Sequence, residues 1–360
     1  MAAPKRGIYT WMVINAIILI ALSAWVLVVT SPAPVISTPP QVIGPSATEP
    51  REPTGPTIPV RADLLRPAAP HFGLAAPDVP WSATKVNGIA AKAGRRPSLM
   101  LYFVNWTKEF DAAPVRLAYQ QGAVPVISWE PWSGLRRGEN QPAYALRKIA
   151  GGAHDAYLIR FATAVRDLRW TVAIRLAHEM NGNWYPWSER RSGNRRGDYV
   201  RAWRHVHDLF GKVGATNVIW IWSPNVIRPL PNVQLEPLYP GDAYVDWVGI
   251  VGYGVNERTA GQTFDPTVRK IRGFTQLPLL LSETGAHPGP LKAMWTANLF
   301  TWLGSRRDVV GFIWFEFDEK TGGTSDWRFD SDQLTLAAFR KGLATARLAQ
   351  PLVSAHDTGP

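Results

Sequence analysis

The chain has 360 residues, of which 46% are hydrophobic, and this is enough for one barrel-sized domain together with an irregular segment. It contains no cysteine, which excludes disulfides, thiolate metal sites and a cysteine nucleophile. The formal charge of +11 would allow binding to anionic polymers or a membrane surface. The basic residues occur as scattered pairs without interleaved aromatic residues, so we expect no nucleic-acid partner.

Residues 8–30 form an apolar segment, and about twenty such residues are enough for a helix to cross a bilayer. Lys5 and Arg6 precede the segment and no comparable charge follows it, so the positive-inside rule places residues 1–7 in the cytoplasm. A cleaved signal peptide, which would make the protein secreted, usually has a shorter apolar core of about 7–15 residues. We therefore predict a single-pass anchor in the cell membrane, with the rest of the chain extracytoplasmic.

Residues 31–70 are rich in proline, glycine, serine and threonine and carry few large apolar residues. Such a segment cannot bury enough surface to order itself, so we predict a disordered, semi-extended linker. At the other end of the chain, residues 351–360 are expected to form a flexible tail. The linker would hold a folded domain away from the membrane.

Between residues 71 and 350, short runs rich in β-branched and aromatic residues alternate with longer helical patterns, which is typical of βα units on a parallel sheet. Eight strands, each followed by a helix, fit the size of a (β/α)8 TIM barrel, and we expect this catalytic domain to be monomeric. Helical patterns include residues 155–168, 198–213, 290–303 and 333–348. The expected strands are residues 71–75, 98–103, 124–129, 171–179, 217–224, 247–253, 279–283 and 309–317.

Two glutamates end strands of this predicted barrel. Glu179 ends the fourth strand, and Glu283 ends the seventh. Because the reactive groups of a TIM barrel lie at the C-terminal ends of its strands, both carboxyl groups should face one mouth. A lone glutamate at a strand end more often caps a helix or forms an ion pair. Two of them at these positions, each beside a glycine-bearing turn, favour the carboxyl pair of a glycosidase, which is about 5–5.5 Å apart in retaining enzymes.

The residues around both glutamates resemble a known family. His178-Glu179-Met180-Asn181-Gly182 with Trp184 and Trp187, together with Ser282-Glu283-Thr284-Gly285, is similar to glycoside hydrolase family 26, best known for β-mannanases. The resemblance covers about residues 70–347, and the segments at 129–132 and 222–225 also look like the family pattern. It implies that Glu179 is the general acid/base and Glu283 the nucleophile.

Other polar residues are expected to support these two. Arg175 could point into the barrel and hold Glu283, or form a purely structural ion pair inside it. His178 could bind the sugar, orient a carboxylate, or have only a structural role. The resemblance to related barrels implies that Tyr253 donates a hydrogen bond to the nucleophile, with core packing as the alternative.

Aromatic side chains are the expected sugar platforms, because their flat faces stack on sugar rings. By resemblance to similar barrels, Trp314 would lie under the sugar at the cleavage point. Trp129, Trp132, Trp184 and Trp187 would extend the cleft, although not all four can be engaged, and any single tryptophan could equally be core.

No motif of metal ligands, phosphate-binding loop or serine-nucleophile elbow is present, so we expect neither metal nor cofactor. The predicted function is endo-acting hydrolysis of a β-linked polysaccharide with net retention. Mannan is the first guess that the resemblance implies, and β-1,3-xylan and mixed-linkage β-glucan stay open. The alternative is a catalytically silent, membrane-tethered module for carbohydrate binding or exopolysaccharide assembly.

Overall fold

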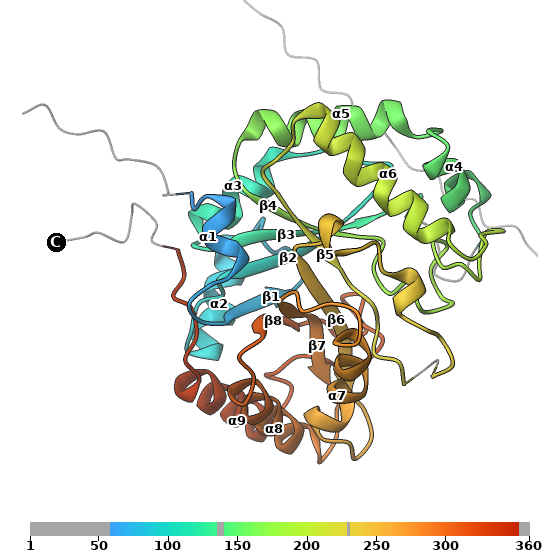
Figure 1. The fold of residues 1–360 in the computed structure, drawn as a ribbon. Helices are drawn as coiled ribbons and strands as arrows, with labels where there is room; N and C mark the ends of the chain where they lie inside the picture. Colours follow the sequence, from blue (N-terminus) through green and yellow to red (C-terminus); the bar gives the residue numbers. More distant parts are fainter. Residues whose placement is uncertain (1–57, 135–139, 229–230, 353–360) are drawn as a thin grey trace, which may run out of the picture. The chain divides into compact units, whose positions relative to one another are not determined.

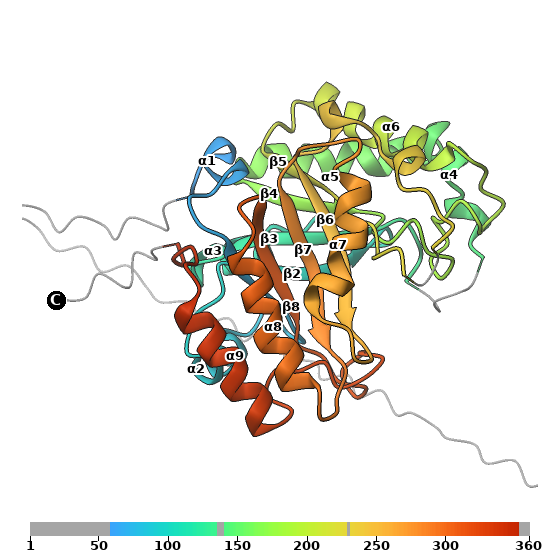
Figure 2. The same cartoon turned by 60° about the horizontal axis from the view of Figure 1, so that its bottom comes forward.

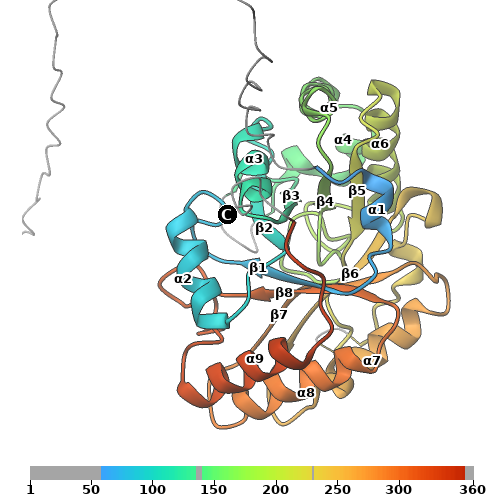
Figure 3. The ribbon, with the colours of Figure 1, turned by 90° about the vertical axis from the view of Figure 1, so that its left-hand side faces the viewer.

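The computed structural model describes residues 58–134, 140–228 and 231–352. In this part of the chain eight parallel strands pair in sequence order, and the first pairs with the last to close a barrel, with helices around the outside (Figures 1 and 3). The predicted parallel barrel is therefore confirmed. The strands are β1 (His71–Ala75), β2 (Leu99–Asn105), β3 (Val124–Glu130), β4 (Val172–Leu176), β5 (Val218–Trp222), β6 (Trp247–Gly254), β7 (Leu279–Ala286) and β8 (Val309–Phe315).

The outer helices begin at local signals that the sequence carries. Ser82, Asp111, Thr259 and Asp332 each accept a backbone N–H at a helix start, which satisfies donors that the helix itself cannot pair. In Figure 2 the last two long helices, α8 and α9, run side by side. The α-helices are α1 (Arg61–Leu65), α2 (Ala83–Ala93), α3 (Ala112–Gln120), α4 (Leu146–Ala150), α5 (Asp155–Leu168), α6 (Asp198–Val213), α7 (Ala260–Ile271), α8 (Lys292–Gly304) and α9 (Gln333–Thr345).

One predicted helix is missing after β5. The described residues between β5 and β6 form only short 3-10 helices, η2 (Glu236–Leu238) and η3 (Asp242–Tyr244), in addition to η1 (Pro142–Tyr144) between β3 and α4. Prolines recur through the β5–β6 connection, and proline removes the N–H that an α-helix interior requires. The expectation that a helix follows every strand is therefore wrong at this position.

The barrel domain begins before residue 71, where the predicted disordered linker was expected to end. Arg61 of α1 forms an ion pair with Asp246, and its Nε donates to the Val218 carbonyl oxygen at 2.6 Å. Leu64 is buried, and the Trp247 indole donates to the Leu65 carbonyl oxygen at 3.0 Å. These contacts fold residues 58–70 onto the base of β5 and β6, which corrects the C-terminal part of the linker prediction.

The structure describes neither the first 57 residues nor those after residue 352. The predicted anchor at residues 8–30 and the linker up to residue 57 lie outside the described residues, as does the predicted tail from residue 353 onward. Among the helices that are described, none combines the length and the apolar character needed to cross a bilayer. The backbone N–H of Leu352 donates to the Gly122 carbonyl oxygen at 2.8 Å, so the folded domain extends to this residue.

The two faces of the strands carry different side chains, because successive residues of a strand point to opposite sides. Large aromatic residues point outward and pack under the helices; Trp129, for example, stacks on Phe161 of α5 with ring centroids 4.2 Å apart. Glycine, serine and the polar groups around Glu283 are among the residues that point inward. A Cβ atom at Gly249 of β6 would lie 2.8 Å from the Ser223 Cβ and 2.9 Å from the Ser282 Oγ, so the barrel interior is tightly filled here.

We expect Gly249→Ala to destabilise the fold by about 1–3 kcal/mol, because the added methyl group overpacks the barrel interior. The measurement is urea-induced unfolding of the variant beside the wild type. Gly88→Ala is the matched control: Gly88 lies in α2 with nothing within 4 Å of an added Cβ, so this change should raise stability by about 0.5–1 kcal/mol. Equal effects of the two substitutions would contradict the packing argument.

Candidate active site

The fourth strand ends three residues before Glu179, earlier than predicted. β4 stops at Leu176, and Ala177 and Glu179 adopt positive φ angles of 45° and 54°, which non-glycine residues rarely adopt. Hydrogen bonds from neighbouring strands hold this turn: the Ala177 N–H donates to the Trp129 carbonyl oxygen at 3.0 Å, and the Glu179 N–H donates to the Ser223 carbonyl oxygen at 2.7 Å. The turn lifts the Glu179 side chain into the mouth, at the C-terminal ends of the strands.

Two side-chain donors fix the Glu179 carboxyl group. The Trp184 indole donates to Oε2 at 2.6 Å, and the Asn225 Nδ2 donates to Oε1 at 2.5 Å. Asn225 is held in turn by Asn181, whose Nδ2 donates to the Asn225 carbonyl oxygen at 2.8 Å and whose Oδ1 accepts the Asn225 N–H at 2.9 Å. Gly182 allows the Trp184 ring to fold back over the turn, because a Cβ there would lie 2.5 Å from the ring.

The environment of Glu179 favours its neutral form. Burial of the carboxyl group is the largest influence and raises its pKa above the ordinary value, and the negative charge of Glu283 raises the pKa further. The hydrogen bonds from Asn225 and Trp184 and the charge of Arg175 act in the opposite direction without cancelling these effects. A raised pKa is what a carboxylic acid needs in order to donate a proton near neutral pH.

Glu283 reaches the same pocket because the seventh strand is irregular. β7 pairs with β6 through Leu281 opposite Ile250 and Glu283 opposite Val251, so Ser282 is an extra residue in the register. In a regular strand Ser282 and Glu283 would point to opposite faces. Here the Ser282 Oγ lies 2.7 Å from the Ser223 Oγ inside the barrel, and Glu283 also points inward.

The Glu283 carboxylate accepts one hydrogen bond on each oxygen. The Arg175 guanidinium donates to Oε1 at 2.6 Å, and the Tyr253 hydroxyl donates to Oε2 at 2.9 Å. Arg175 has no exposed surface, and its Nε and one terminal nitrogen also donate to the Ser128 Oγ at 3.1 and 2.9 Å. Charge-assisted donors stabilise the ionised carboxylate, so this group is suited to act as a nucleophile.

His178 lies behind the carboxyl pair and is buried. Its Nδ1 is 3.2 Å from the Ser128 Oγ, and its Nε2 is 3.2 Å from the Tyr185 hydroxyl and 4.0 Å from Glu130 Oε1. Ser128 already accepts hydrogen bonds from Arg175, so its own proton is directed toward His178. His178 is thereby linked to Arg175 through one hydroxyl group, which makes its position dependent on the same network.

Most of the predicted tryptophan platforms are core residues, which corrects that prediction. Trp129 and Trp314 have no exposed surface, because both fall on the outward face of their strands; Trp314 packs on Phe339 of α9. Trp187 is also fully buried and stacks on Tyr185, while Trp132 packs edge-on against Trp187. Trp184 is the member of this set that stays partly exposed while it contacts Glu179.

The structure also brings residues into the site that we did not predict. Asn225 lies in the Trp-Ser-Pro-Asn segment, whose resemblance to the family pattern was the one available signal. Ser128 can be assigned to the site only from the β3–β4 strand register, which places it beside Arg175. Trp327 lies in the β8–α9 loop, with its ring centroid 4.5 Å from that of Tyr253, and Phe315 contacts the same tyrosine at 6.0 Å. No local sequence pattern points to these last two.

Comparisons with known proteins find the glycoside hydrolase family that the sequence resembles. The profile of Glycosyl hydrolase family 26 matches residues 152–298, which contain both glutamates. The chain is 30% identical over 282 residues to Endoglucanase H of Acetivibrio thermocellus, a match that covers 73% of this chain. The barrel is thus similar to glycoside hydrolase family 26. Over 152 residues, or 37% of the chain, it is also 35% identical to Mannan endo-1,4-beta-mannosidase A and B of Caldalkalibacillus mannanilyticus.

The barrel also has counterparts among solved structures. The catalytic domain of the Bacillus sp. JAMB-750 endo-beta-1,4-mannanase superposes with a TM-score of 0.60 at 17% identity, covering 79% of this chain and 88% of that one. At this identity the likeness shows the fold alone. The two curated relatives are larger proteins, of which this chain spans 30% and 29%.

The coupling between the two carboxyl groups can be measured directly. Replacing Glu283 with Gln removes the neighbouring negative charge while keeping one oxygen acceptor for Arg175, so the pKa of Glu179 should fall. Carboxyl-carbon NMR of 13C-labelled protein across a pH titration would show this shift. Glu109→Gln is the control, because Glu109 is exposed and pairs with Arg160. An unchanged Glu179 titration in the Glu283 variant would show that the two groups are not coupled.

Proposed function

We propose that the barrel is a retaining, endo-acting glycoside hydrolase that cleaves a β-linked polysaccharide. One observation carries this proposal: two neighbouring carboxyl groups have opposite environments. Glu179 is buried with a raised pKa, whereas Glu283 is held by the Arg175 cation and the Tyr253 hydroxyl. A neutral acid and an ionised carboxylate are the pair that double displacement requires.

In the first step Glu179 gives its proton to the glycosidic oxygen while a Glu283 oxygen attacks the anomeric carbon. The bond to the leaving sugar breaks, and a glycosyl ester of Glu283 forms. In the second step the ionised Glu179 takes a proton from water, whose oxygen attacks the anomeric carbon and releases the Glu283 carboxylate. Each step inverts the anomeric centre, so the product keeps the original configuration.

The electrostatics of the pocket change during this cycle in a useful way. The negative charge of Glu283 raises the pKa of Glu179 in the free enzyme, which favours the acid form. Formation of the ester consumes that charge, while Arg175 remains positive. The pKa of Glu179 then falls, so the same group is better suited to act as a base in the second step.

Mannan remains the first proposed substrate, in keeping with the mannanases among the curated relatives. A β-glucan is the second candidate, because the Endoglucanase H match extends over 282 residues. A silent binding module is less well supported, since both carboxyl groups and the donors that hold them are present.

We expect the protein to release oligosaccharides from β-mannan or a β-glucan, with β-xylan as a further member of the panel. Retention predicts that the new reducing ends appear first as the β-anomer in 1H NMR. An α-anomer as first product would contradict the double-displacement mechanism. Failure to cleave any glycan of the panel would contradict the hydrolase assignment for these substrates and favour the binding module.

Glu179→Ala and Glu283→Ala serve as role controls in the same assay, and each should lower turnover by about 10³-fold or more. Added azide separates the roles. In Glu283→Ala azide replaces the nucleophile and should yield an α-glycosyl azide, whereas in Glu179→Ala it attacks the ester intermediate and should yield the β-glycosyl azide. Exchanged products would reverse the two assignments.

We also propose that residues 8–30 anchor the domain in the cell membrane, facing away from the cytoplasm. The support is the sequence itself: an apolar segment long enough to span, with Lys5 and Arg6 before it. The folded domain would then act on polymers outside the cell, or process a polymer that the cell makes.

The anchor predicts that the full-length protein stays in the membrane pellet after a sodium carbonate wash. A variant that lacks residues 1–30 should move to the soluble fraction. Soluble full-length protein with a new N-terminus after residue 30 would show instead that the segment is a cleaved signal peptide.

A further inference from the structure

The β8–α9 loop, residues 316–332, places an aromatic ring behind the proposed nucleophile. The Trp327 ring lies against Tyr253 with centroids 4.5 Å apart, and Tyr253 donates to Glu283. Both backbone polar groups of Trp327 are fixed: its N–H donates to the Phe317 carbonyl oxygen at 2.9 Å, and its carbonyl oxygen accepts the Trp314 indole N–H at 3.1 Å. The position of the Tyr253 ring therefore depends on how this loop is held.

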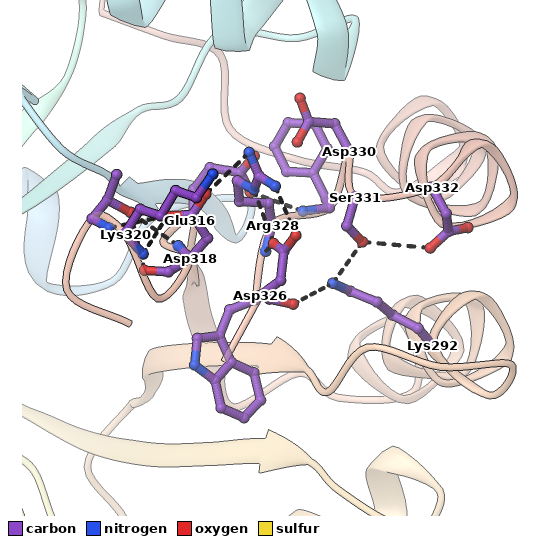
Figure 4. Close-up of polar contacts among 12 residues, drawn as sticks. Lys292, Glu316, Asp318, Lys320, Asp326, Arg328, Asp330, Ser331 and Asp332 are labelled. Carbon is purple, nitrogen blue, oxygen red and sulfur yellow. Dashed lines mark hydrogen bonds and ion pairs between the residues drawn. The ribbon is translucent and has the colours of Figure 1, made fainter. Parts of the chain in front are cut away.

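Lys292 holds the loop from a neighbouring element. It is the first residue of α8, which follows the strand that carries Glu283, and it is buried with 1% exposure. Its Nζ donates to the carbonyl oxygen of Asp326 at 2.8 Å and to the Ser331 Oγ at 2.9 Å, as Figure 4 shows. Asp326 directly precedes Trp327, so this ammonium group ties the tryptophan's own backbone to α8.

A buried ammonium group needs such partners, because burial lowers the pKa of Lys292. The charges of Asp326, Glu316 and Asp332 oppose that effect. All three carboxyl groups also have partners of their own: Asp326 pairs with Arg328 at 2.7 Å, Glu316 accepts the Phe329 N–H at 2.9 Å, and Asp332 accepts the Thr335 N–H at 2.8 Å. The polar groups of the loop thus pair mainly with one another, and Lys292 connects them to α8.

A second lysine reaches the same loop without reaching Trp327. Lys92 of α2 pairs with Asp330 at 2.5 Å, but its side chain is 58% exposed. Exposed pairs of this kind contribute little to stability. The two lysines therefore form a natural comparison: one is buried beside the tryptophan, and the other lies at the outer edge of the loop.

We propose that Lys292 is a positioning residue for the nucleophile, acting through Trp327 and Tyr253, and this inference rests on the proposed function. The ammonium group fixes the backbone next to Trp327, the Trp327 ring supports Tyr253, and the Tyr253 hydroxyl orients Glu283. We expect its effect in the attack of Glu283 on the anomeric carbon more than in substrate binding, because its hydrogen bonds are with loop groups and not with either glutamate.

The test is a double-mutant cycle on the full-length protein. Lys292→Met should lower kcat by about 10- to 100-fold with little change in KM, because a misplaced reacting group costs rate more than binding. Tyr253→Phe removes the hydrogen bond itself. If Lys292 acts through Tyr253, the double variant should be no slower than Tyr253→Phe alone. Lys92→Met should leave both constants near the wild-type values.

Trp327→Leu provides a second route to the same link if Lys292→Met does not fold. It leaves the backbone acceptor of Asp326 in place. The double variant Trp327→Leu with Tyr253→Phe should again have a kcat no lower than that of Tyr253→Phe alone. Losses that multiply in the double variants, or a Lys292→Met enzyme with wild-type kcat, would overturn the inference. If the wild type cleaves no glycan, the proposed function fails separately. A crystal structure of Lys292→Met then decides: an unmoved Trp327 ring overturns the positioning role, and a displaced ring supports it.

Discussion

Arg175 has no exposed surface, and its charge is matched at the barrel mouth by Glu283. A buried cation without a partner would cost several kcal/mol, so this pairing constrains everything around it. Ser128 accepts hydrogen bonds from the Nε and one terminal nitrogen of the guanidinium, and its own hydroxyl hydrogen points toward His178. Glu179 shares the pocket with an ion pair that is already complete, and its own charge is the one that burial disfavours. The contrast between the two glutamates thus originates in one arginine.

The aromatic residues explain how such a polar pocket is supported. The chain contains 17 tryptophans, and Trp129, Trp222 and Trp314 are fully buried on the outer face of the barrel strands. Their rings fill the space between strands and helices, where a large flat side chain contributes much buried surface. The aromatic richness is therefore chiefly a packing property of the outer layer. Trp184 shows the other use, because it is partly exposed and donates to Glu179.

The strands, the closed barrel and the ends at which Glu179 and Glu283 lie could be predicted from the sequence, because hydrophobic runs and the parallel-barrel rule determine them. Side-chain direction could not be predicted where the backbone departs from the regular period. The positive φ at Glu179 and the extra residue at Ser282 are such departures. The direction of Trp314 was decided by which face of β8 meets α9, and Lys292 matters through a loop whose path no local pattern encodes.

The irregular register of β7 has a consequence for how such a pocket can arise or be lost over evolution. Ser282 and Glu283 both face the barrel interior because the strand contains one residue more than its neighbours accommodate. A substitution changes the chemistry of the side chain but leaves its direction as it is. Deleting the codon of Ser282 would restore regular pairing, with Leu281 opposite Ile250 and the glutamate still opposite Val251, so the glutamate would keep its inward direction and only the serine hydroxyl would leave the interior. A one-residue gap beside an intact glutamate in a homologous barrel is therefore compatible with a retained carboxyl pair, whereas an added residue between Glu283 and Thr284 would disturb the pairing on its C-terminal side.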